Sequence, residues 1–156
     1  MTSIGRWLFL ASHNQKPNEM RHPLAHATFI ISGDSVNPEF WTSYFGVQPS
    51  RVITKGQPFQ LPSGKLSPRA GKLGLWALES KAAVHSDCLG PHLQYITNYL
   101  GLPRAGLHEL VRRQGGKMAM WCYWMNETGD RVPDVPDDIR AMMEAMGGTI
   151  EIDEYR

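Results

Sequence analysis

The chain has few of the residues and segments that would tie it to one chemistry or compartment. It contains 2 cysteines in 156 residues, and they lie far apart, at Cys88 and Cys122. Two distant cysteines do not make the disulfide framework of a small secreted domain, so we expect a cytoplasmic protein. No apolar run approaches the ~20 residues of a membrane-spanning helix, and we therefore expect no membrane partner.

The chain also lacks a dominant charge and a recognisable catalytic motif. It has 16 Lys and Arg residues against 15 Asp and Glu residues, for a net charge of +1. Such a balance provides no overall field for nucleic acid, so we expect no nucleic-acid partner. The sequence has no Gly-x-Ser-x-Gly elbow and no phosphate-binding Gly-x-x-x-x-Gly-Lys-Ser/Thr loop. These absences predict a protein that is not an enzyme and that requires no cofactor.

What the chain does have is one order of elements used twice. Residues 27–55 and residues 117–155 each predict a strand, a Pro-containing turn, a short helix, a Gly and a second strand. In the first copy, Asn37 is a good helix cap, Pro38 suits the first helical position, and Gly46 suits the end. The repeat therefore predicts two β-α-β halves.

Hydrophobic patterns along the whole chain predict the order β-α-β-β-α-α-β-α-β. Strands covered by helices on one side form an α+β two-layer sandwich, either ferredoxin-like or made of the duplicated β-α-β halves. We expect an N-terminal extension over residues 1–24 and a single α+β domain over residues 25–156. The predicted strands are 27–33, 51–54, 72–79, 118–125 and 149–153; the predicted helices are 38–45, 86–100, 104–114 and 136–146, with a long loop at 56–71.

Several short motifs, taken in their order, resemble a family of small bacterial proteins known as domain-of-unknown-function family 4279. The motifs are Ile31-Ser32-Gly33, Asn37-Pro38-Glu39-Phe40-Trp41, Phe45-Gly46-Val47-Gln48-Pro49, Lys55-Gly56-Gln57, Gly74-Leu75-Trp76 and the closing stretch from Met146 to Tyr155. The resemblance covers about residues 27–155. It implies a cytoplasmic bacterial protein, sometimes encoded beside toxin genes as a candidate immunity protein, and it carries over no catalytic residue.

Basic residues around the long loop are the strongest candidates for a binding site. Arg51, Lys55 and Arg69 could converge on a carboxylate or phosphate, where Arg offers a two-pronged contact. The alternative is a solvated strand edge that Lys and Arg protect from aggregation. Trp76 is a candidate anchor for a partner at the same surface.

Three further groups of residues allow a functional interpretation but favour a structural one. His85, Cys88 and His92 are weak zinc candidates, because Gly90-Pro91 interrupts a continuous helix and no fourth ligand follows. Trp121, Tyr123 and Trp124 could stack on nucleic-acid bases, but a strand that is apolar on both faces predicts burial. The carboxylates of the C-terminal part predict helix capping, surface charge or a partner surface; they are Asp134, Asp137, Asp138, Glu151, Asp153 and Glu154.

Two functions from different classes remain open. The first is a non-catalytic domain that binds another protein, such as a toxin that it neutralises by covering the active site. The second is a sensor for a small anionic ligand, bound in a cleft between the two β-α-β halves by the same basic residues. An exposed apolar face of the sheet would in addition predict a homodimer.

Overall fold

The computed structural model describes residues 23–156, and the expected extension at residues 1–24 lies almost wholly outside the described residues. A five-stranded sheet has the strand order β2-β3-β1-β4-β5. Its strands are β1 (Ala25–Gly33), β2 (Arg51–Ile53), β3 (Gly74–Glu79), β4 (Gly116–Met125) and β5 (Thr149–Tyr155). The described helices are α3 (Pro38–Phe45), α4 (Leu89–Leu100), α5 (Leu107–Arg113) and α6 (Asp137–Ala145). This order of elements confirms the prediction.

The sheet confirms an α+β fold and explains how both predicted architectures apply to it. β1 pairs with β3 and β4 in antiparallel register, and β2 pairs antiparallel with β3. β1 to β4, with α3 and α4, therefore have the split β-α-β connectivity of a ferredoxin-like sandwich. β5 then pairs with β4 in parallel, which adds a second β-α-β unit at the edge.

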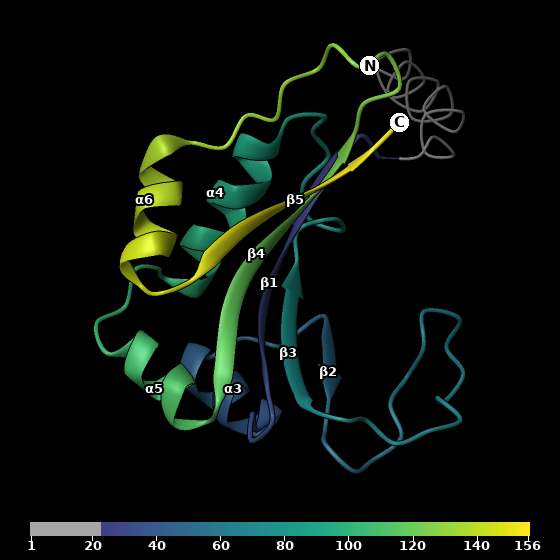
Figure 1. The fold of residues 1–156 in the computed structure, drawn as a ribbon, viewed down its shortest axis with the longest axis vertical. Helices are drawn as coiled ribbons and strands as arrows, with labels where there is room; N and C mark the ends of the chain where they lie inside the picture. Colours follow the sequence, from purple (N-terminus) through teal and green to yellow (C-terminus); the bar gives the residue numbers. More distant parts are fainter. Residues whose placement is uncertain (1–22) are drawn as a thin grey trace, which may run out of the picture.

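One face of the sheet is covered by the helices and the other is open. Figure 1 shows the helices on one side of the sheet and the loop between β2 and β3 projecting on the other side. Side chains alternate accordingly, because successive strand residues point to opposite faces. The helix-facing residues form one buried core with residues of the helices, as in Ile31, Trp76 and Met120, each 0% exposed.

Local sequence explains the first helix well. The Asn37 side chain accepts a hydrogen bond from the backbone N–H of Glu39 at 3.1 Å, and Pro38 occupies the first turn. Gly46 ends α3 in the left-handed region, at φ 69°, where a residue with a Cβ would be strained. Trp41 and Phe45 are the buried aromatic residues of α3, and they pack the helix onto the sheet.

Candidate interaction surface

The open face of the sheet carries a row of aromatic side chains on its upper half. Trp121 is 45% exposed and lies in register between Thr28 on β1 and Glu151 on β5. Tyr123 stacks on His26 with ring centroids 4.5 Å apart, and Tyr155 lies 5.1 Å from the other side of Tyr123. We call these four rings, His26, Trp121, Tyr123 and Tyr155, the aromatic row.

The aromatic row corrects one prediction from the sequence. We expected Trp121, Tyr123 and Trp124 to be buried because both faces of the strand are apolar, but the helices cover only one face, and alternate residues point to opposite faces. Trp124 is 2% exposed on the helix side, beneath the guanidinium of Arg131 at 3.9 Å from its ring centre. Trp121 instead points away from the core. The prediction of burial therefore holds for Trp124 and is wrong for Trp121.

The histidine of the aromatic row is neutral at neutral pH. Burial of the His26 ring and, to a smaller extent, the nearby Lys81 and His92 together lower its pKa to about 4. A neutral ring can stack on Tyr123 without bringing a charge onto the face. The row is therefore an uncharged surface under ordinary conditions.

Residues 54–73, which we call the arm, form a long excursion between β2 and β3. The arm is held by its own hydrogen bonds: the Ser67 N–H donates to the Phe59 carbonyl at 2.7 Å, and the Leu61 N–H donates to the Lys65 carbonyl at 2.7 Å. The Ser67 hydroxyl also donates to the Arg69 carbonyl at 2.6 Å. These bonds fold the arm into a hairpin-like loop without a regular β-strand.

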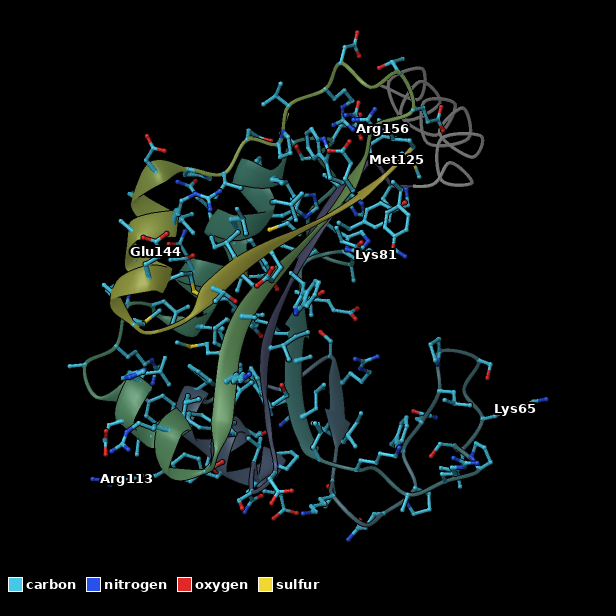
Figure 2. The ribbon with its side chains drawn as sticks, viewed as in Figure 1. Lys65, Lys81, Arg113, Met125, Glu144 and Arg156 are labelled. Atoms are coloured by element: carbon cyan, nitrogen blue, oxygen red, sulfur yellow. The ribbon has the colours of Figure 1, made fainter. Side chains whose placement is uncertain are left out.

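The arm is strongly basic. It contains no Asp or Glu in its sequence, and its cations are Lys55, Lys65, Arg69 and Lys72. Figure 2 shows Lys65 on the outer part of the arm, pointing away from the sheet. Leu66 beside it is 70% exposed. The arm therefore presents positive charge and, at Leu66 and Leu73, exposed apolar side chains to a partner.

A slot separates the arm from the edge strand β2. The cavity has a volume of about 620 Å³, within the range of ligand and peptide sites. Its walls come from residues 49–54 on one side and residues 57–62 of the arm on the other, with Glu79 of β3 at the end. Arg51 lines this slot, and among residues 23–156 its guanidinium forms no ion pair.

The structure does not bring the predicted anion-binding residues together. Lys55 is engaged outside the slot, because its Nζ lies 2.5 Å from a carboxylate oxygen of Asp34. Arg69 lines a separate hollow of about 330 Å³ on the other side of the arm. Only Arg51 remains in the slot. The two ends of the arm are joined by a bridge between Lys55 and Gly71, but the side chains of Lys55 and Arg69 lie at Asp34 and in the separate hollow, so closeness in the sequence does not bring these cations to Arg51.

Trp76 does not lie at any interface. It is 0% exposed, and its indole N–H donates to the Thr42 hydroxyl at 3.1 Å. Its ring stacks on Phe45 with centroids 5.1 Å apart. The structure therefore corrects the prediction that Trp76 anchors a partner: alternation along β3 turns it toward α3, into the core.

The weak zinc candidates have separate, structural positions. The His92 ring is buried, with Nδ1 2.7 Å from the Ser80 hydroxyl and Nε2 2.8 Å from the Ser86 carbonyl. Because a carbonyl oxygen can only accept, the Nε2–H donates to Ser86, and Nδ1 of the neutral ring accepts from the Ser80 hydroxyl, whose oxygen accepts from the Ala27 N–H at 2.9 Å. Within residues 23–156, no group of three or more His, Cys, Asp or Glu side chains could hold a metal ion.

The two thiols differ in their chemistry. Burial raises the pKa of the Cys122 thiol to about 12, so this group stays protonated and unreactive. Cys88 is exposed and precedes α4. Neither cysteine hydrogen-bonds to a histidine that could activate it, among the contacts of residues 23–156.

A second hollow, which the sequence did not predict, lies at the lower end of the sheet. It has a volume of about 540 Å³ and exists because β5 begins at Thr149, opposite Ala119, whereas β4 begins at Gly116. Its ionisable and aromatic wall residues come from α5, β4 and β5, so no local motif could reveal it. They are His108, Arg112, Lys117, Trp121 and Glu151.

The two β-α-β halves do not enclose the cleft expected for a sensor. β1 and β4 pair along their whole common length, from Ala25 opposite Trp124 to Gly33 opposite Gly116. A continuous hydrogen-bonded ladder fills the boundary between the halves. A comparable place for a ligand near this boundary is the hollow beside Lys117, which lies at the lower end of the β1–β4 ladder and not between the halves.

Comparison with known proteins agrees with the motifs along the chain. The model of the family described as domain of unknown function (DUF4279) matches residues 22–156. The chain therefore belongs to this family, as its motifs predicted. Searches of the curated proteins and of the solved structures found no match. No helix among residues 23–156 is long and apolar enough to cross a membrane.

Proposed function

From its family and from the slot beside β2, we propose that this domain acts by binding an extended segment of another protein rather than by catalysis. The observation that supports this proposal is Arg51, an unpaired cation on an edge strand that faces a cavity of about 620 Å³. The partner segment lies in the slot and places a carboxylate against the guanidinium.

The edge strand favours this mode of recognition. β2 pairs with β3 on one side only, so its other side is open to an added strand. Main-chain hydrogen bonds would give such a segment its affinity, and a two-pronged contact between Arg51 and a carboxylate would give it specificity. The arm closes the slot from the opposite side, through residues 57–62.

The reactive side chains of the core support a binding role. The Cys122 thiol has a pKa raised by burial, and both ring nitrogens of His92 are engaged in hydrogen bonds. A nucleophile needs an adjacent base and an open position for substrate. Neither Cys122 nor His92 has an open position for substrate beside it, and this favours binding without catalysis.

The finer form of the proposal is neutralisation of a toxin in the bacterial cytoplasm. The resemblance implies that some proteins of this kind are candidate immunity proteins, and occlusion needs only a complementary surface over the partner's active site. The basic arm, with no carboxylate from residue 54 to residue 73, suits a partner with an acidic surface. Protection of cells that produce a candidate partner toxin, with Arg51→Glu as the comparison variant, would test this form directly.

The slot proposal is tested with three single substitutions that the structure separates. Arg51→Glu reverses the charge in the slot, whereas Lys55→Ala and Arg69→Ala change cations outside it. We expect affinity capture from native extract, followed by titration of the purified partner, to show a loss of about tenfold or more for Arg51→Glu only. A photo-crosslinking residue at Phe59 should attach to the same partner segment. Equal losses for all three variants, or none, would contradict the slot.

A small anionic ligand is the second candidate, and the hollow beside Lys117 is what favours it. There an exposed indole, Trp121, lies near the cations of Lys117 and Arg112. A ligand at 100 times its dissociation constant should stabilise the protein by about 2.7 kcal/mol. A thermal-shift screen of metabolite anions, with Lys117→Met as the matched variant, separates this role from protein binding.

A further inference from the structure

The aromatic row lies on a face of the sheet that nothing in residues 23–156 covers at its upper half. Trp121 and Tyr155 are both 45% exposed. The half-buried Ile30 of β1 and Ala119 of β4, which are paired in register, continue the surface below them. Large exposed apolar surface of this kind marks an interaction site.

Charges on this side of the molecule are separated into two places. Toward the upper end and β5, the open face carries Glu79, Glu151 and Asp153. The nearby cations are Lys81 at the end of β3, Arg51 of β2 beside Glu79 in the slot, and Arg156, which pairs with Glu154. The basic arm leaves the sheet at its lower end, beside β2 at the opposite edge (Figure 1). The acidic strand and the basic arm are therefore at opposite corners of one surface.

We propose that a second copy of this chain covers the open face, with the arm of each copy against the β5 carboxylates of the other. The slot lies at the β2 end of the same face, because Arg51 is in register with Ala77 and Glu79 lines the slot; the interface proposed here is centred on the aromatic row and β5. Its oppositely charged corners make the face complementary to itself. A two-fold axis between the copies, perpendicular to the line joining the corners, brings each arm onto the acidic strand of its partner.

The same charges disfavour the other occupants of an aromatic sheet face. A single-stranded nucleic acid stacked on Trp121 and Tyr123 would run its phosphates past Glu151 and Asp153, which lie directly beside these rings in the sheet. The supporting cation at that strand is Lys117, which lies at the lower end of β4. A second copy, in contrast, supplies cations where the carboxylates are and aromatic surface where the rings are.

The test uses two charge-reversal variants and their mixture. The arm variant carries Lys65→Glu, Arg69→Glu and Lys72→Glu, and the strand variant carries Glu151→Lys and Asp153→Lys. We expect light scattering to give twice the chain mass of 17.6 kDa for the wild type. Each variant alone should dissociate at least about a hundredfold more easily, because like charges then face each other. An equal mixture of the two should form a heterodimer.

Controls on the helix side separate this interface from general charge effects. Arg113→Glu and Glu144→Lys change exposed residues on the helix side of the sheet (Figure 2) and should leave the mass unchanged. Trp121→Ser should weaken the dimer while the thermal unfolding of the variant shows an intact fold.

A monomeric wild type, or a dimer that both charge-reversal variants retain, would overturn the proposal. Retardation of single-stranded RNA by the wild type at low salt, lost in Trp121→Ser, would overturn it in favour of nucleic acid. A monomer that still binds a protein through Arg51 would leave the proposed function standing.

Discussion

Two segments of the chain have the same order of strand, helix and strand, but their strands pair differently. In the first segment, from β1 to β2, β3 lies between the two strands, whereas in the second segment β4 and β5 pair directly with each other. The first is a split β-α-β unit, and its second strand contains 3 residues. The second is an adjacent parallel unit, and its last strand contains 7 residues.

The difference lies in the position of β3. The arm returns the chain from β2 into β3, which inserts beside β1 and leaves β2 at the edge with a slot next to it. β5 pairs directly with β4 and forms the acidic edge. The same local pattern therefore produces a basic, recessed edge at one side of the sheet and an acidic, longer edge at the other.

The two units also differ in how tightly they are packed, and paired glycine substitutions should reveal this. A Cβ at Gly74 of β3 would overlap the backbone carbonyl of Val36, and backbone cannot move aside as a side chain can. We expect Gly74→Ala to lower the free energy of unfolding by about 3 kcal/mol or more. Urea denaturation followed by tryptophan fluorescence measures this change.

The matched substitution in the second unit is Gly148→Ala. There the added Cβ would lie 2.8 Å from the terminal methyl of Met143 and 3.1 Å from the Met118 carbonyl. A methionine side chain adapts readily, so we expect a loss of about 1 kcal/mol. If Gly148→Ala proved as costly as Gly74→Ala, the two units would be equally rigid.

Acid should weaken the contact between the units, because His26 of β1 stacks on Tyr123 of β4. Burial lowers the pKa of His26 from 6.5 to about 4, and burial also lowers the pKa of His92. Below pH 6.5 the unfolded chain binds protons that the folded chain does not, so stability falls as the pH falls. For His26 the loss by pH 5 is at most about 2 kcal/mol, and partial exposure of the ring makes it smaller.

The replacement His26→Phe keeps an aromatic ring on Tyr123 and removes the titrating group. We expect thermal unfolding of this variant to depend less on pH between 7 and 5 than that of the wild type. The dependence that remains should include that of His92, whose Nδ1 cannot take a proton without losing the bond from Ser80. A variant with an unchanged pH dependence would show that His26 is protonated equally in both states.

The sequence predicts the elements of this fold far better than its surfaces. The bounds of α3 follow from Asn37, Pro38 and Gly46, which act through their own backbone neighbours. The exposure of Trp121 depends instead on which side of β4 the helices cover, and a strand that is apolar on both faces does not specify it. The separation of Arg51 from Lys55 and Arg69 depends on the path of the arm, whose turns no hydrophobic period describes.

The acidic residues before α6 illustrate the same limit and give the smallest expected effect. Asp134 was expected at the start of its own helix, but its carboxylate accepts from the Leu89 and Gly90 N–H groups at 2.7 and 2.9 Å. It therefore caps α4, whose own N-cap residue, Cys88, makes no side-chain hydrogen bond to the helix. Asp138 remains in the first turn of α6.

Substitution of each carboxylate should show which helix it serves. We expect Asp134→Ala to cost about 1–2 kcal/mol, because two backbone donors at the start of a buried helix lose their acceptor. Asp138→Asn, which removes only a favourable charge from the start of α6, should cost about 0.3–1 kcal/mol. Hydrogen exchange locates the effect: Asp134→Ala should raise exchange in the first turn of α4 and leave α6 unchanged. Faster exchange in α6 instead would mean that Asp134 stabilises the start of α6, the helix that follows it in the sequence, and not the start of α4.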